Sequence, residues 1–172
     1  MKKISSLTEL FVEQIKELYD SERKQQDVFQ KFIKSARSND LKKLMLKIAE
    51  QTDSQVMRLE EVLELLGEPL RGVECKPMKE LLARSLSLSR TSANPEILET
   101  SLIAAIQCAK HFEIAVYGTL VAFAESLGDN ESADILARTL AEEKALDNEL
   151  TELAMESINS RAKESEPAAY AF

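Results

Sequence analysis

The chain has 172 residues, 44% of them hydrophobic, which fits one globular domain with a sizeable core. Its net charge of −8 argues against a protein that binds nucleic-acid phosphates, and no apolar run approaches the roughly 18 residues of a membrane span. Cys75 and Cys108 match no metal or redox spacing, and the stretch MKKISSLTEL lacks the apolar segment of a signal peptide. We therefore expect reduced thiols and a cytoplasmic location.

The first half of the chain contains two long segments with helical periodicity. The first begins at SLTE, where Ser6 and Glu9 form a capping box, and runs to about residue 36. The second starts after the capping pair at 39–40 and ends at Gly67, a residue that suits a left-handed helix end. The two segments predict a pair of long helices joined by a short turn.

The second half repeats this arrangement after a long connection. The turn-rich stretch GEPLRGVECKP is followed by MKELLARSLSLS, which predicts a short helix. A third long helix opens at Asn94 with proline at its first position and closes before Gly128. A fourth follows at 129–130 and fades near Lys163, so we expect one domain over 1–163 and a disordered tail over 164–172.

This order of elements limits the topology. Short loops join antiparallel neighbours, whereas a connection of roughly 28 residues is long enough to travel the length of the bundle. The sequence therefore predicts an all-α protein, a ferritin-like four-helix bundle whose long crossover carries a short extra helix. The alternative is a plain up-and-down bundle with an extra helix across one end.

Polar residues interrupt the apolar stripes of three of these helices near their middles. In the fourth helix the stripe of leucines and alanine is broken by two acids, and Glu113 and Glu22 interrupt the third and first helices in the same way. Lys110 lies one turn before Glu113. The stripe of the fourth helix reads Leu136, Leu140, Glu143, Asp147, Leu150 and Ala154, and the first helix adds Gln25 beside Glu22.

Acids at matching heights on three helices would meet in one buried layer. Carboxylates in an apolar interior repel one another unless they are protonated, paired or joined to a cation. Iron and manganese prefer carboxylate and imidazole ligands, and bundle cores are a common place to hold two such ions. The alternative is a buried ion-pair network in which Lys110 supplies the positive charge and no metal binds.

Four stretches together resemble the YciF/YciE-like family of bacterial ferritin-fold proteins, which are associated with stress responses. They are LYDSE, EQTDSQVMRLEEVLELLGE, SLIAAIQCAKHFEIAVYGTL and LAEEKALDNELTELA, and the resemblance covers about residues 6–160. It implies a homodimer with a di-iron-type site related to that of rubrerythrins. It also implies peroxide or oxygen chemistry, which would need an external reductant because the chain has no CxxC pair.

The resemblance also assigns metal ligands. Its motifs place them at Glu22, Glu113, Glu143 and Asp147, and it favours Glu50 in the second helix. Helical periodicity favours Gln51 and Gln55 instead, with Glu50 facing the site only if the helix is distorted by a π-bulge.

Lys110 is the main departure from the family pattern, because relatives tend to carry a second glutamate there. A two-metal site of iron or manganese, a single-metal site and a metal-free bundle with a structural or interaction role all remain open. Three other features have a bland and a functional interpretation. His111 is expected to pack at a helix or subunit contact. The stripe of small residues beside it forms either a dimer face or ordinary packing within the bundle, and Tyr19 and Tyr117 either fill the core or support the ligands. The stripe comprises Ala104, Cys108, Ala115, Gly118 and Ala122.

Overall fold

The computed structural model describes residues 3–92 and 94–167, and it is helical without strands over those residues. The first pair of helices is α1 (Leu7–Ser35) and α2 (Asn39–Leu65), and the second is α4 (Pro95–Leu127) and α5 (Asn130–Leu153). Helix α3 (Lys76–Thr91) lies on the crossover, and a π-helical turn, η1 (Ala154–Ile158), leads into the short α6 (Asn159–Glu164). The predicted ferritin-like bundle with a helical crossover is confirmed.

The helix ends follow from their capping residues. Ser6 accepts a hydrogen bond from the backbone N–H of Glu9 at 3.1 Å, while the Glu9 carboxylate accepts from Ser5 rather than from Ser6. Asn94 caps α4 with proline behind it, and Asp129 caps α5. Gly67 and Gly128, at φ values of 66° and 76°, adopt the left-handed conformation after α2 and α4.

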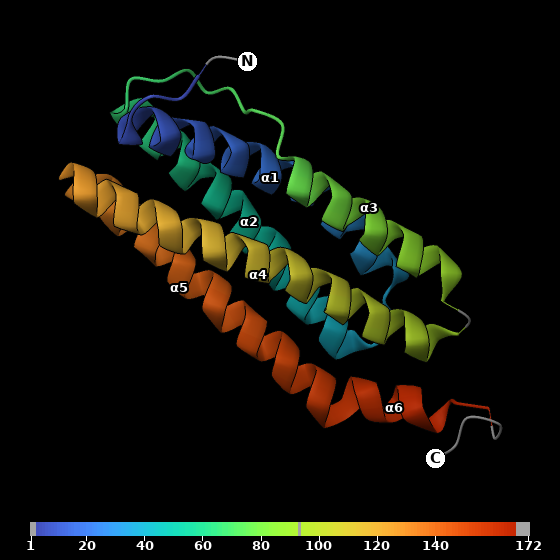
Figure 1. Cartoon of the computed structure of the whole chain (residues 1–172). Coiled ribbons are helices and arrows are strands. Elements are labelled where there is room, and N and C mark those ends of the chain that lie inside the picture. Colours follow the sequence, from blue (N-terminus) through green and yellow to red (C-terminus); the bar gives the residue numbers. More distant parts are fainter. Residues whose placement is uncertain (1–2, 93, 168–172) are drawn as a thin grey trace.

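The four long helices pack in a square, with α1 beside α2 and α4, and α5 beside α4 and α2 (Figure 1). The crossover runs the length of the bundle, and α3 covers α1 and α4 on one side (Figure 1). The plain up-and-down alternative is therefore wrong. Within the described residues no helix is long and apolar enough to cross a lipid bilayer.

The C-terminal region only partly tests the expected tail. Helix α6 ends at Glu164, and the description stops at Pro167, so 168–172 lie outside the described residues.

The small-residue stripe lies on the outward side of α4. Ala104, Cys108, His111, Ala115 and Ala122 are exposed there, so these members of the small-residue stripe do not pack inside the bundle.

Two apolar clusters fill the bundle, one toward each end. The first includes Phe32, Ile48 and Ile106, and the second includes Phe11, Leu59 and Leu120. Between them every long helix contributes buried polar side chains. We call this set the central polar layer; its members are Glu22, Gln25, Gln55, Lys110, Glu113, Tyr117 and Glu143.

Candidate metal centre and charge layer

Three of the predicted site residues meet in the central polar layer. Glu22 from α1, Glu113 from α4 and Glu143 from α5 have no exposed surface, and each offers a carboxylate oxygen within 4.8 Å of the others. Their helices bring them together because each residue stands on a core-facing stripe at the same height along the bundle. The sequence-based prediction of an acidic layer is confirmed for these three positions.

Lys110 lies among these acids and is fully buried. Its Nζ is 2.9 Å from Oε2 of Glu113 and 2.9 Å from Oε2 of Glu143. The ammonium also lies 5.7 Å from the centre of the Phe29 ring, a cation–π distance. The layer therefore contains its own cation, placed between the carboxylates of two neighbouring helices.

Amide and phenol donors complete the pairing of the acids. Gln25 Nε2 donates to Glu113, and Gln55 Nε2 donates to Oε1 of Glu143 at 2.7 Å. The Tyr117 hydroxyl donates to Oε1 of Glu22 at 2.9 Å. Tyr117 thus supports a layer carboxyl group. Tyr19 instead donates to Glu60, at 2.8 Å, outside the layer.

Burial and neighbouring charge set the protonation of the layer. Burial, followed by the negative charge of Glu113, raises the pKa of Glu22 well above its ordinary value. Burial raises the pKa of Glu143 to about 7 although Lys110 acts in the opposite direction. Burial alone would lower the pKa of Lys110, but Glu113, Glu143 and Glu22 together raise it. Near neutral pH Glu143 is therefore partly protonated. Burial favours the neutral form of Glu22, and the surrounding acids favour the charged form of Lys110.

Two predicted ligands lie elsewhere. Helix α2 is a regular α-helix around Glu50. Its buried face carries residues 48, 52, 55 and 59, so the side chain of Glu50 is exposed. Asp147 is part-buried at the edge between α4 and α5, where its carboxylate lies 3.6 Å from His111 Nε2 and 3.4 Å from Gln107 Nε2. The positions predicted for Glu50 and Asp147 are corrected by the structure.

Helix α2 instead presents amides and a hydroxyl. Gln55 and Thr52 have no exposed surface, whereas Gln51 is part-buried. The side-chain oxygens of Gln25, Gln55 and Thr52 have no hydrogen-bond partner among the described residues. The layer thus contains unpaired acceptors as well as the pairs above.

Thr139 lies at the border of the layer and was not among the predicted site residues. Arg58 donates to the Thr139 hydroxyl at 2.9 Å and forms an ion pair with Glu142 at 2.6 Å. Thr139 is 1% exposed and stands one turn before Glu143. A hydroxyl on the core-facing stripe of α5 was the available signal, but the choice of Leu140 over Thr139 for that stripe concealed it.

Comparisons with known proteins agree with this architecture. A protein family described as a domain of unknown function, DUF892, matches residues 6–163. The chain is 29% identical over 161 residues to the protein YciF of Escherichia coli K12, covering 93% of this chain and 97% of YciF.

Solved structures of related proteins have the same helical bundle. The crystal structure of the E. coli stress protein YciF matches with a TM-score of 0.86 at 29% identity, over 91% of this chain and 99% of that one. YcfI from Rhodopseudomonas palustris, described as a candidate structural protein, matches at 0.85 with 30% identity, over 87% and 96%. A protein from Xanthomonas campestris shares the fold at a TM-score of 0.75 and 22% identity, over 92% and 97%.

Proposed function

The chain belongs to the DUF892 family of YciF-like proteins, and we propose that it is a bundle with a structural or partner-binding role, in which Lys110 replaces a metal ion. One observation carries this proposal. The ammonium of Lys110 lies within 3.0 Å of carboxylate oxygens on both Glu113 and Glu143. A cation is already present where the acids converge, and it is covalently part of the chain.

The residues present do not fit the two-metal site that the resemblance implies. Two-metal carboxylate sites in bundles use a glutamate from each of two helices and a Glu-x-x-His motif from each of the other two. Here the layer provides three carboxylates, α2 contributes the amide of Gln55, and the one histidine of the chain, His111, is exposed. Lys110 stands three residues before Glu113, where a second metal ligand would be needed, and its charge would repel an ion.

A single-metal site is the second candidate, and one observation favours it. The three carboxylate oxygens within 4.8 Å of one another form an oxygen-rich set, and the unpaired oxygens of Gln25 and Gln55 lie in the same layer. Such a set suits iron or manganese. Bound iron would supply peroxide or oxygen chemistry and would need an external reductant. This candidate requires Lys110 to lose its proton or to leave the layer.

Metal titration separates the two candidates. We would add Fe(II) and Mn(II) anaerobically to wild type, to Lys110→Glu, and to Lys144→Glu, which makes the same charge change at an exposed position of α5. We expect wild type and Lys144→Glu to retain no metal after desalting and Lys110→Glu to retain it. Stoichiometric metal in wild type, with peroxide consumption that depends on iron, would overturn the proposal.

The names of the relatives are compatible with a non-catalytic role. The R. palustris relative is described as a candidate structural protein, and the E. coli relative as a stress protein. A role in stressed cells, in the cytoplasm, follows for this chain by analogy alone. Both cysteines are free thiols, which suits a reducing compartment.

A homodimer is part of the same proposal. The exposed small residues on α4, among them Ala104, Ala115 and Ala122, would allow a second copy to approach closely. We expect a dimer mass in light scattering for wild type and a monomer for Ala115→Lys. A monomeric wild type would contradict this part of the proposal.

A further inference from the structure

The charge of the chain is unevenly distributed along its sequence. Residues 23–47 contain eight Lys or Arg and two Asp, a net formal charge of +6 in a chain whose total is −8. This segment forms the second half of α1, the turn to α2 and the first turns of α2. We call six of its side chains the basic patch; they are Lys31, Lys34, Arg37, Lys42, Lys43 and Lys47.

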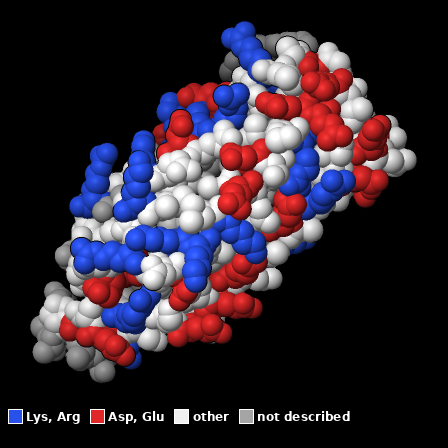
Figure 2. Space-filling model, turned by 180° about the vertical axis from the view of Figure 1, so that it is seen from behind, with Lys and Arg blue, Asp and Glu red and all other residues white. Residues whose placement is uncertain are grey.

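The turn between the helices gathers these side chains at one end of the bundle. At 1.5 Å per residue, all six lie within roughly 14 Å of the turn along the helix axes. Five of them are exposed, and Lys42 is part-buried. Figure 2 shows many Lys and Arg side chains on the left half of this face, with Asp and Glu among them, and a denser group of Asp and Glu at the upper right end.

Most of the positive charges of the basic patch are not paired with an acidic side chain of the described residues. Lys31, Lys34, Arg37 and Lys42 form no ion pair with any described residue. Lys43 lies 3.9 Å from Asp40, with both side chains more than 70% exposed, so that contact contributes little. Of the six, Lys47 alone has a close acidic partner among the described residues, Glu149, at 2.5 Å.

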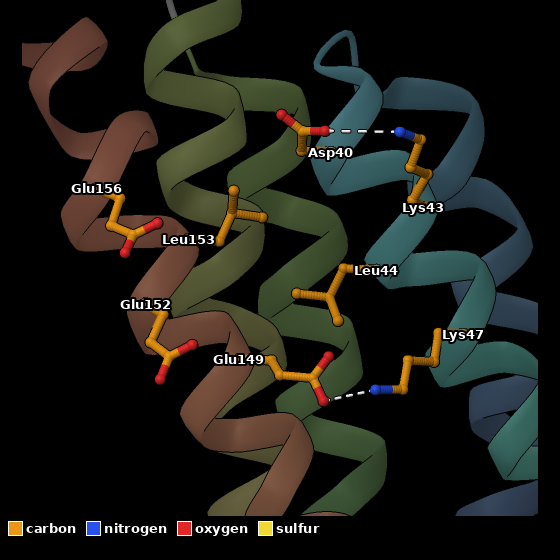
Figure 3. A pocket seen from close by; sticks show the side chains of 8 residues that line it. All are labelled: Asp40, Lys43, Leu44, Lys47, Glu149, Glu152, Leu153 and Glu156. Carbon is orange, nitrogen blue, oxygen red and sulfur yellow. Dashed lines mark hydrogen bonds and ion pairs between the residues drawn. The ribbon is translucent and has the colours of Figure 1, made fainter.

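A groove between α2 and the end of α5 adjoins the basic patch. The extra residue of the π-helical turn η1 changes the course of the helix there. The groove has a volume of about 360 Å³, with Lys43 and Lys47 on one side beside their partners Asp40 and Glu149 (Figure 3). Leu44, which is 8% exposed, and the part-buried Leu153 lie between the two helices. Glu152 and Glu156 line the other side, and neither forms an ion pair with a described residue (Figure 3).

The surroundings favour a short acidic protein segment over a nucleic acid. Duplex DNA carries one negative charge per ≈1.7 Å, and its backbone would continue from the patch onto Glu149, Glu152 and Glu156. Among residues 3–92 and 94–167 no aromatic side chain is exposed, so stacking on bases has no platform. A protein segment can place carboxylates on the lysines and an apolar side chain on Leu44 and Leu153.

We propose that the basic patch and the adjoining groove form a docking site for an acidic segment of a partner protein. Carboxylates of the segment contact Lys31, Lys34 and Lys43, and one large apolar side chain lies on Leu44 and Leu153. This names the partner class for the proposed binding role. It does not depend on the metal question, because the central polar layer is not part of the site.

Peptide binding tests the proposal. The probe is a fluorescein-labelled peptide, EEDEEDELFS, whose acids lie on one side of its apolar residues, titrated with the full chain at low and moderate salt. We expect saturable binding that weakens as salt rises, and a loss of roughly tenfold or more in Lys31→Glu/Lys34→Glu/Lys43→Glu. The matched control, Lys76→Glu/Lys79→Glu/Lys144→Glu, makes the same charge change at exposed lysines elsewhere and should bind as wild type does. Circular dichroism verifies that each variant is folded.

Further binding measurements decide among the possible partners. Glu152→Gln/Glu156→Gln removes two carboxylates that line the groove, and this variant should bind the peptide more tightly. A peptide with Gly in place of Leu and Phe should bind more weakly. Equal binding of the two peptides, or equal losses in the patch and control variants, would overturn the proposal. So would tighter binding of a 20-base-pair DNA duplex or of phosphatidylserine vesicles than of the peptide.

Discussion

Two apolar clusters and the central polar layer between them share one bundle interior but are stabilised in different ways. The clusters consist of side chains such as Leu59, Leu120 and Ile106, with 1% of their surface exposed or less, whose burial contributes roughly in proportion to area and without directional demands. The layer consists of equally buried polar and charged groups, whose desolvation is costly unless every partner is present. Loss of one member should therefore be tolerated differently in the two regions.

The largest expected effect comes from removing the cation of the layer. Lys110→Met leaves Glu113 and Glu143 buried without their shared partner, so we expect the free energy of unfolding at pH 7.5 to fall by about 3–5 kcal/mol. Urea denaturation measures it. Lys110→Met/Glu113→Gln/Glu143→Gln, which removes all three charges, should recover most of the loss. A loss below about 1 kcal/mol in the single variant would mean that the layer is not an ion-paired unit.

A cavity in an apolar cluster should cost slightly less and should behave differently. Leu120→Ala is expected to lower the free energy of unfolding by about 3 kcal/mol, through lost burial and an unfilled void. Because no charge is involved, the loss should be the same at pH 5 and pH 8 in urea denaturation. A cost that changed with pH would show that the clusters and the layer are not separate.

The pH dependence of stability isolates the layer. The pKa of Glu143 rises from 4.5 to about 7 on folding, so the folded state retains a proton that the unfolded chain has lost. The stabilisation is complete below pH 4.5 and is lost as pH rises through 7. We expect this carboxyl alone to lower the free energy of unfolding by about 2 kcal/mol between pH 5 and pH 8. Glu22, whose pKa is also raised, acts in the same direction, so Glu143→Gln should reduce the change without abolishing it. An equally steep profile in that variant would assign the whole change to other groups.

The smallest effect on the free energy of unfolding is expected for a lysine–glutamate ion pair that is exposed to solvent. Lys47 and Glu149 are 2.5 Å apart, but their side chains are 47% and 39% exposed. Lys47→Met should therefore change the free energy of unfolding by less than about 0.5 kcal/mol, and added salt should reduce the difference further. A loss comparable with that of Lys110→Met would remove burial as the explanation of the contrast.

Local signals were sufficient to predict the fold. Ser6, Asn94, Gly67 and Gly128 mark helix ends through their own side chains or backbone preferences, and these signals depend little on the rest of the molecule. The long connection with its short helix then left few topologies open.

The site was predictable only in part. Glu22, Glu113 and Glu143 interrupt apolar stripes and lie in the layer, but Asp147 does not, because the stripe of α5 continues through Thr139 and Leu146 rather than through Leu140. Near the edge of a helical face, neighbouring positions differ too little in polarity for a sequence to separate them. The assignment of Glu50 as a ligand came from the family resemblance, and the regular geometry of α2 directs its side chain to solvent. The contact of Lys110 with two helices depends on packing that no single helix encodes.

Anomalous diffraction tests the account most directly. Crystals of the wild-type chain soaked in Fe(II) or Mn(II) would be measured at the iron and manganese absorption edges. We predict no anomalous peak among Glu22, Glu113 and Glu143, with the Lys110 ammonium between the carboxylates. An ordered metal peak within coordination distance of those three residues, with Lys110 displaced, would contradict it.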